Sequence, residues 1–286
     1  MRDFLRPDAA YGSLVSLLVA QICTPPEKDS AVRIRSRQLS VLTAAAVAGI
    51  VLAACGGGSS SEVVARVAGV GTISKATLEH WMPIEATVIY KEYPTTAVPK
   101  GVVPDPPSYT ACIAYLKATP EKLVETGPKP TAAQLKGKCR QKLGELRVLT
   151  LNTLIGWYWI IGAGMTLGMK ASDAEVQARI VQGNKQYFPK SGELARYLRL
   201  TGQTNVDLAL RAKVQVFETK LLALQTAIEK RLPKNASDQQ KRAALAKYEQ
   251  SLPPGGGWVA KTSCSRGYVV SACKQYKGTQ PPGIPN

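Results

Sequence analysis

The sequence predicts a mainly α-helical protein with a small β-hairpin near the start of its mature part and a disulfide-closed hairpin near its C-terminus. Three observations support this prediction. Apolar residues recur at helical spacing over most of residues 74–252. An alternating, β-prone pattern is confined to residues 63–74, where Gly69 and Gly71 supply turn signals. A second β-prone run, residues 268–270, lies between two cysteines.

A short motif, Leu52-Ala53-Ala54-Cys55-Gly56, divides the chain into two parts. Before it come three arginines at positions 33, 35 and 37, then an uncharged apolar run, then small residues. This order is typical of a secretory signal whose apolar region is too short for a comfortable bilayer span. The motif resembles a bacterial lipobox, which implies a diacylglyceryl group on Cys55 and cleavage just before it. The alternative is a structural cysteine that follows an apolar helix.

The N-terminal boundaries follow from this motif. We expect residues 1–31 to be a non-native extension, because a separate apolar run and the polar segment TPPEKD precede the arginines. Residues 32–54 would then be the lipoprotein signal peptide. Residues 55–62 contain GGGSSS, a composition typical of a flexible tether. We therefore expect the chain to lie at the extracytoplasmic face of the cell membrane, held by a lipid.

The charge balance indicates an acidic partner. Of 37 basic and 20 acidic residues, 31 and 16 follow residue 54, which leaves a net charge of +15 there. Such a balance favours nucleic acid, anionic lipid, acidic polymers of a cell envelope or acidic client proteins. The signal peptide argues against nucleic acid, and no zinc-finger or aromatic RNA-binding motif occurs. We expect an anionic membrane surface as the partner, reached through the lipid anchor.

Four cysteines follow Cys55, an even number in a chain that leaves the reducing cytosol. They allow three disulfide pairings. We favour Cys112 with Cys139 and Cys264 with Cys273, because each pair flanks one local excursion of the chain. A zinc site is the alternative, but the sequence has no CxxC and a single histidine. We expect neither a metal nor a cofactor.

Capping signals and apolar periodicity predict a series of helices. Ser74 is the N-cap of the first, which contains Pro83, and Ser172 opens another with a capping box to Glu175. A proline-rich insertion occupies about residues 94–130. Helices are expected over 109–118, 131 to about 168, 172–188, 193–202, 205–231 and 237–252. In the helix over 205–231, apolar residues repeat at Val206, Leu210, Val214, Phe217, Leu221, Leu224 and Ile228.

The longest expected helix contains 22 consecutive uncharged residues, 148–169. Its length allows a transmembrane span. Asn152, three threonines and four glycines lower its hydrophobicity, and a core helix of a soluble domain is equally apolar on all sides. Both interpretations stay open at this point.

The order of the motifs resembles a known family. After the lipobox come VVARVAGVGTISKATLEHW, a long helix ending in LGM, then ASDAEVQARI, YFPKSGELARYLRLTGQT and a helix ending in AIEKR. This order is similar to the N-terminal domain of extracytoplasmic foldases of the SurA and PrsA type. The resemblance covers about residues 63–231, and its most telling stretch is residues 172–202.

The resemblance implies a helical module, distantly like the chaperone part of trigger factor, that holds unfolded clients in a cleft after secretion. With it we assign residues 63–252 to the chaperone domain. Residues 253–286 are expected to be a C-terminal disulfide hairpin and tail because of the β-prone run between their two cysteines. The full foldases also carry a parvulin prolyl isomerase domain before the last helix. Here only residues 232–235 lie at that place, so we expect that domain to be absent.

No catalytic residue is expected. His80 is the only histidine, so no serine or cysteine nucleophile has a second histidine as its base. We expect His80 to be a partly buried structural residue. An active enzyme is therefore not expected.

A protein that holds unfolded clients needs exposed apolar surface with adaptable side chains, as methionine and aromatic residues provide. The same side chains at helical spacing also build cores, so each candidate has that alternative role. The candidates are Trp81, Met82, Trp157, Trp159, Met165 and Met169. The leading hypothesis is a lipid-anchored extracytoplasmic chaperone. The alternatives are a scaffold lipoprotein with one fixed partner and a prolyl isomerase relative with degenerate or no catalysis.

Overall fold

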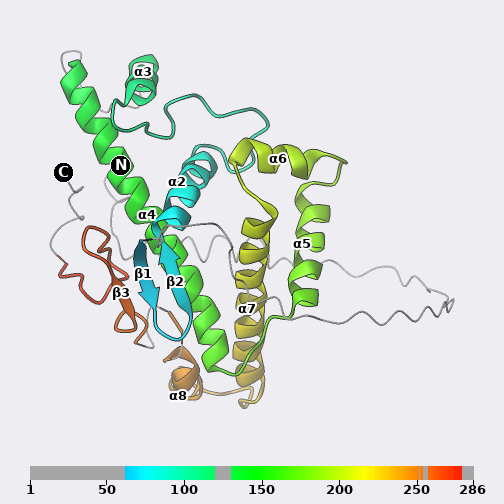
Figure 1. The fold of residues 1–286 in the computed structure, drawn as a ribbon. Coiled ribbons are helices and arrows are strands. Elements are labelled where there is room, and N and C mark those ends of the chain that lie inside the picture. Colours follow the sequence, from blue (N-terminus) through cyan, green and yellow to red (C-terminus); the bar gives the residue numbers. More distant parts are fainter. Residues whose placement is uncertain (1–61, 120–129, 251, 254–256, 279–286) are drawn as a thin grey trace, which may run out of the picture. The chain divides into compact units, whose positions relative to one another are not determined.

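The computed structural model describes residues 62–119, 130–250, 252–253 and 257–278, all within one unit of the chain, Gly58–Asn286 (Figure 1). The lipobox, the signal peptide, the extension before it and most of the tether lie outside the described residues. The described elements, in chain order, are β1 (Val63–Val67), β2 (Gly71–Ser74), α2 (Lys75–Tyr90), α3 (Thr110–Ala118), α4 (Ala132–Thr166), α5 (Asp173–Tyr187), α6 (Glu193–Thr201), α7 (Asn205–Lys230), α8 (Asp238–Glu249) and β3 (Thr262–Cys264).

The mainly helical class and the N-terminal hairpin are confirmed. Strands β1 and β2 pair antiparallel, and Gly69 takes a positive φ of 77° in the turn between them. Helix α2 begins directly after β2 because the Ser74 hydroxyl accepts a hydrogen bond from the Thr77 amide. Capping boxes begin α4, α5, α7 and α8 in the same manner.

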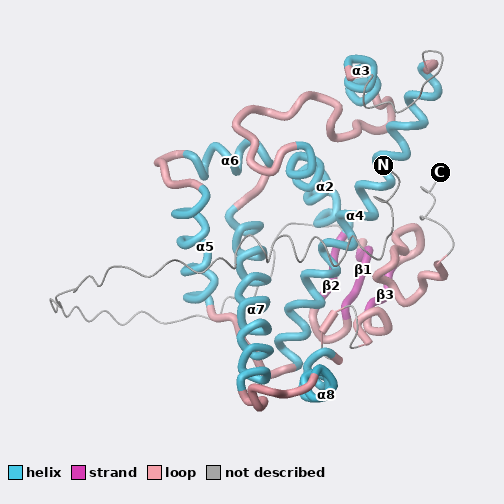
Figure 2. Tube along the Cα trace, turned by 180° about the vertical axis from the view of Figure 1, so that it is seen from behind, coloured by secondary structure: helices cyan, strands magenta, loops and turns pink. Residues whose placement is uncertain are grey.

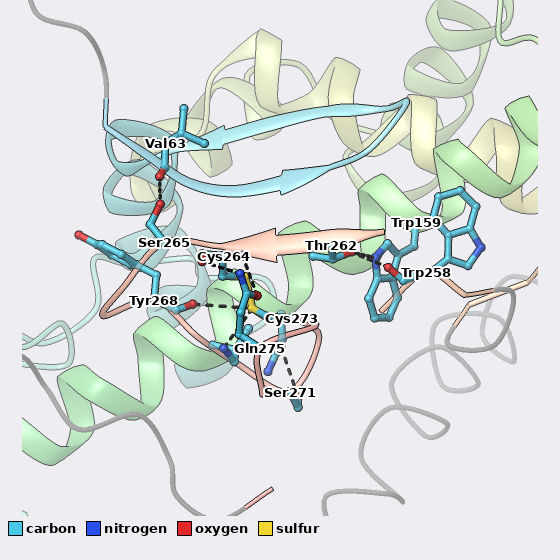
Figure 3. The surroundings of a disulfide bond; sticks show 12 residues. Val63, Trp159, Trp258, Thr262, Cys264, Ser265, Tyr268, Ser271, Cys273 and Gln275 are labelled. Atoms are coloured by element: carbon cyan, nitrogen blue, oxygen red, sulfur yellow. Dashed lines mark hydrogen bonds between the residues drawn. A yellow bond between two sulfur atoms is a disulfide. The ribbon is translucent and has the colours of Figure 1, made fainter. Parts of the chain in front are cut away.

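The predicted C-terminal hairpin is wrong. Residues 268–270 form no strand, and β3 instead pairs antiparallel with β1, so the sheet order is β2-β1-β3. The edge of β1 that β2 does not occupy supplies β3 with the backbone hydrogen bonds that a neighbouring strand of a local hairpin would have supplied. Beyond the ladder, Ser265 donates its amide to the Val64 carbonyl at 2.9 Å and its hydroxyl to the Val63 carbonyl (Figure 3).

Two disulfides join the pairs that the sequence favours. Cys112 of α3 is bonded to Cys139 of α4, and Cys264 of β3 to Cys273. The first fastens α3 to the N-terminal half of α4, and the second closes a loop of eight intervening residues beside the sheet (Figure 3). The Gln275 side chain also bonds the backbone of Cys264 through both its amide nitrogen and its oxygen.

Helix α4 is the central element. It packs against α2, α3, α7 and the β1–β2 hairpin, and Figure 2 shows the sheet on one side of it and α7 on the other. In the described part of the chain it is the one helix long and apolar enough to cross a membrane, and half of its most apolar window is buried. Its packing supports the core interpretation, because none of residues 150–164 within the uncharged run is exposed.

Two glycines in this run allow close packing. A Cβ at Gly162 would lie 2.4 Å from the Trp258 ring, and one at Gly164 would lie 2.2 Å from Cδ1 of Phe217. The run is therefore glycine-rich where the C-terminal segment and α7 approach α4. The Trp159 indole donates a hydrogen bond of 2.8 Å to the Thr262 hydroxyl, which ties α4 to β3 (Figure 3).

Helices α5 and α8 pack on α7, whereas α6 contacts α2. Helix α5 packs along α7, on the side away from α4 in both views (Figures 1 and 2). Helix α6 ends at Gly202, which takes a positive φ of 74° as the sequence predicts. Helix α8 packs against α7, where the Tyr248 hydroxyl donates to the Leu221 carbonyl at 3.0 Å.

Candidate functional site

An open hollow of about 380 Å³ lies between α2 and the first turns of α7. Its apolar lining includes the buried Trp81 ring, the half-buried Leu210 and Val206, whose side chain is 76% exposed. His80 and Asp207 form its polar part. The hollow therefore combines an accessible apolar surface with one hydrogen-bonding pair.

The polar pair connects the two helices. Nε2 of His80 lies 2.9 Å from Oδ2 of Asp207, across 127 positions of sequence. The same carboxylate oxygen accepts hydrogen bonds from the amide and the hydroxyl of Thr204, because Asp207 also closes the capping box of α7. Burial opposes ionisation of Asp207, but the hydrogen bonds from His80 and Thr204 outweigh it and lower the pKa of this carboxyl.

An aromatic and cationic cluster surrounds Trp81, one of the residues that line the hollow. The rings of Trp81 on α2 and Trp157 on α4 meet edge to face, with centroids 4.9 Å apart. The guanidinium of Arg211 on α7 lies over both rings, at 5.1 and 5.7 Å from their centroids. Arg211 also lies 3.8 Å from the carboxylate of Glu85. Burial raises the pKa of Glu85, and the charge of Arg211 acts against this rise.

The chemistry of this hollow suits binding. Its two hydroxyl groups are engaged in helix capping: Thr77 lies within hydrogen-bond distance of Ser74, and Thr204 donates to Asp207. The His80–Asp207 pair therefore has no hydroxyl nucleophile in the lining that is free to use it as a base. Within the described residues, no group of three or more histidine, cysteine or acidic side chains could hold a metal ion.

A second hollow, of about 460 Å³, lies at the opposite end of the sheet from Ser74. The turn of the β1–β2 hairpin, the C-terminal end of α4 and the segment around Trp258 line it. Met165 contributes a flexible side chain that is 50% exposed, and Lys261 lies over the Trp258 ring at 4.5 Å.

The structure separates the six client-binding candidates. Trp81, Met82 and Trp159 are buried in the core, so they offer little or no surface to a client. Their burial follows from the central position of α4, which needs large side chains on several sides. Trp157 is partly buried against Trp81. Met165 lines the second hollow, and Met169 is partly buried against the cluster that contains Phe217. The client-binding expectation for Trp81, Met82 and Trp159 is therefore corrected to a core role, and that for Trp157, Met165 and Met169 stays a prediction.

The sequence reasoning missed Asp207 as part of a site and assigned Val206 to the apolar face of its helix. The Thr204-x-x-Asp207 capping box was a local signal that could have identified Asp207. The exposure of Val206 had no such signal, because periodicity cannot show where a neighbouring helix ends. His80 is exposed rather than partly buried and is hydrogen-bonded to a second helix, and its expected structural role stays a prediction.

Comparison of the chain with models of protein families, with curated proteins and with solved structures finds no match in any of the three.

Proposed function

We propose that this chain is a lipid-anchored extracytoplasmic chaperone of the SurA and PrsA type that binds unfolded protein segments without catalysing a reaction. The α2–α7 hollow is the proposed client site. The observation that carries this proposal is the exposed Val206 side chain beside the half-buried Leu210 in the lining of the hollow. An apolar, open surface of this kind accepts side chains of many sequences.

The polar part of the hollow complements this apolar surface. An unfolded segment presents backbone amide and carbonyl groups that need partners when they leave water. The His80 ring is 41% exposed, so its remaining edge can bond such a group while Asp207 holds the ring in place. One hydrogen-bonding pair at the edge of an apolar surface provides affinity with little selection among sequences.

The second hollow extends the apolar surface available to a client. Met165 is unbranched and polarisable, so it adapts to side chains of different shape. The two hollows lie on different parts of the unit, and a long unfolded segment can contact both. In this proposal Cys55 carries the lipid, and the signal peptide directs the chain out of the cytoplasm.

The experiment that tests this proposal is suppression of aggregation. Residues 56–286, produced under oxidising conditions, are added to several unrelated proteins as these are diluted from denaturant, at low and at raised salt. A chaperone that binds through apolar surface suppresses aggregation of most of these proteins, and the effect persists at raised salt because screening weakens only the charge contribution.

Two other results would overturn the proposal. If no client is protected, or if raised salt removes all protection, the hollow is not a general client site. A scaffold lipoprotein with one fixed partner would then be the better interpretation. Protection that depends on one particular client would lead to the same conclusion.

A further inference from the structure

The positive charge of this protein is concentrated in two short segments. Residues 132–147 contain five basic residues and one acidic residue, and residues 257–278 contain four basic residues and no acidic one. Together they carry +8 of the net +15 that follows residue 54. The first segment is the N-terminal half of α4, and the second contains β3 and the Cys264–Cys273 disulfide.

The two segments are neighbours in space. The guanidinium of Arg147 on α4 lies over the ring of Tyr268, 5.9 Å from its centroid. Lys136, Arg140 and Arg147 are separated by four and seven positions, so they lie along one flank of the helix. The basic stripe of α4 therefore leads to the C-terminal segment.

The C-terminal segment presents its cations to solvent. Arg266, Lys274 and Lys277 are exposed, and none of them has an ion-pair partner among the described residues. Between the two lysines lies Tyr276, whose side chain is 38% exposed. A tyrosine flanked by lysines is typical of surfaces that meet the headgroup layer of a membrane, where the ring is partly buried and its hydroxyl stays in water.

This surface lies where the chain enters the unit. Ser265, which precedes Arg266, bonds the backbone of both Val63 and Val64 at the start of β1 (Figure 3). Glu62 lies seven positions after Cys55, and a chain over seven positions spans at most about 25 Å. If Cys55 carries a lipid, Arg266 is therefore held close to the bilayer.

We propose that the exposed cations Arg266, Lys274 and Lys277, with Tyr276 between them and with Lys136 and Arg140 of α4 as a continuation, form a docking surface for an anionic lipid bilayer. The proposal rests on the lipid anchor of the proposed function. The bilayer is the polyanion that the short tether places at this surface, and tethering raises its effective concentration there. The C-terminal segment and α7 lie on opposite sides of α4 in both views (Figures 1 and 2), so docking leaves the α2–α7 hollow accessible.

The test uses lipid-free residues 56–286, which contain the whole compact unit with its own core. Binding is measured by flotation with vesicles of phosphatidylcholine alone or of an equal mixture with phosphatidylglycerol. We expect binding to the mixed vesicles only. The triple variant Arg266→Gln, Lys274→Gln, Lys277→Gln should weaken this binding on the order of 100-fold, since each cation near an anionic surface contributes about fivefold.

The matched control is the triple variant Lys213→Gln, Lys234→Gln, Arg242→Gln, which removes the same charge from exposed positions on α7, on the loop after it and on α8. It should keep most of the vesicle binding. Equal weakening by both triple variants would overturn the proposal, because net charge rather than this surface would then govern binding.

A second variant separates a bilayer from a soluble acidic polymer. Tyr276→Ala should weaken binding to the mixed vesicles but not to soluble polyglutamate, since only the bilayer offers an interface for the ring. If Tyr276→Ala bound the mixed vesicles as well as the wild type does, a bilayer would not be the partner of this surface. The same samples are assayed for aggregation suppression. A wild-type protein that binds no vesicles but suppresses aggregation would overturn this inference alone, and a wild-type protein that binds vesicles but suppresses no aggregation would overturn the chaperone proposal alone.

Discussion

His80 of α2 and Asp207 of α7 are joined at 2.9 Å, and Asp207 is at the same time the residue that closes the capping box of α7. One carboxylate therefore fixes where α7 begins and how α2 lies against it. This contact defines the polar part of the hollow proposed to hold clients. It also gives the protein a titratable group whose protonation acts on the fold.

Asp207→Asn should lower the stability of the protein above about pH 5 by about 1 kcal/mol, the usual cost of weakening a helix cap. The pKa of Asp207 is below its ordinary value of 3.8. The ionised Asp207 carboxylate therefore contributes its full stabilisation of the fold above this ordinary pKa. That stabilisation is lost as the pH falls through the lower pKa of the folded state. Urea denaturation over an acidic pH series should show that the variant loses less stability on acidification than the wild type does.

The control for this comparison is Asp173→Asn, in the exposed first turn of α5. Asp173 does not close its capping box, since Glu175 does. If the stability of Asp207→Asn depended on acidic pH as the stability of the wild type does, the hydrogen bonds of this carboxylate with His80 and Thr204 would contribute nothing to the stability of the fold.

Glu218 should make the protein less stable as the pH rises. Burial between α5 and α7 raises the pKa of Glu218 to about 7, although the charge of Arg179 acts against this rise. The folded state therefore favours the neutral acid. The contribution of neutral Glu218 to the stability of the fold is complete below the ordinary pKa of 4.5 and is lost as the pH rises through about 7.

Glu218→Gln keeps the neutral form at every pH, so the variant should exceed the wild type in stability by on the order of 1–3 kcal/mol at about pH 8. At about pH 4 the two should be equal. Glu229→Gln, at an exposed position of the same helix, is the control. A Glu218→Gln protein that gains nothing at alkaline pH would contradict the assigned burial.

The glycines of α4 should respond to alanine in opposite directions. A Cβ at Gly164 would overlap the Phe217 ring, so Gly164→Ala should lose about 1–3 kcal/mol. At Gly156 nothing lies within 4 Å of an added Cβ, so Gly156→Ala should be neutral or gain up to about 1 kcal/mol from helix propensity. Urea denaturation of the two variants measures both effects. Equal changes at the two positions would contradict the close contact between α4 and α7.

The sequence predicted those parts of the fold that local chemistry determines. The Ser74 N-cap, the Ser172–Glu175 capping box and the left-handed Gly202 each depend on residues within one helical turn. The two disulfides were also accessible, because each joins cysteines that are close in sequence.

The parts that the sequence did not predict depend on distant segments. The partner of β3 is β1, about 200 positions earlier, and the local β-prone residues 268–270 drew the prediction to a hairpin. The site had the same difficulty. The large residues of α4 were predicted to offer exposed surface, but the C-terminal segment covers Trp159. Val206 was assigned to an apolar helix face, but it is exposed in the open hollow between α2 and α7.

The most direct test of the proposed client site compares two exposed valines. Val206 lines the α2–α7 hollow, whereas Val181 is 44% exposed on α5 and does not line it. Binding of a fluorescently labelled, permanently unfolded polypeptide is measured by anisotropy for Val206→Glu and Val181→Glu. We predict about tenfold weaker binding for Val206→Glu, since a charge replaces a side chain whose burial contributes about 1.5 kcal/mol, and no change for Val181→Glu. Equal affinities for both variants and the wild type would contradict the assignment of the hollow as the client site.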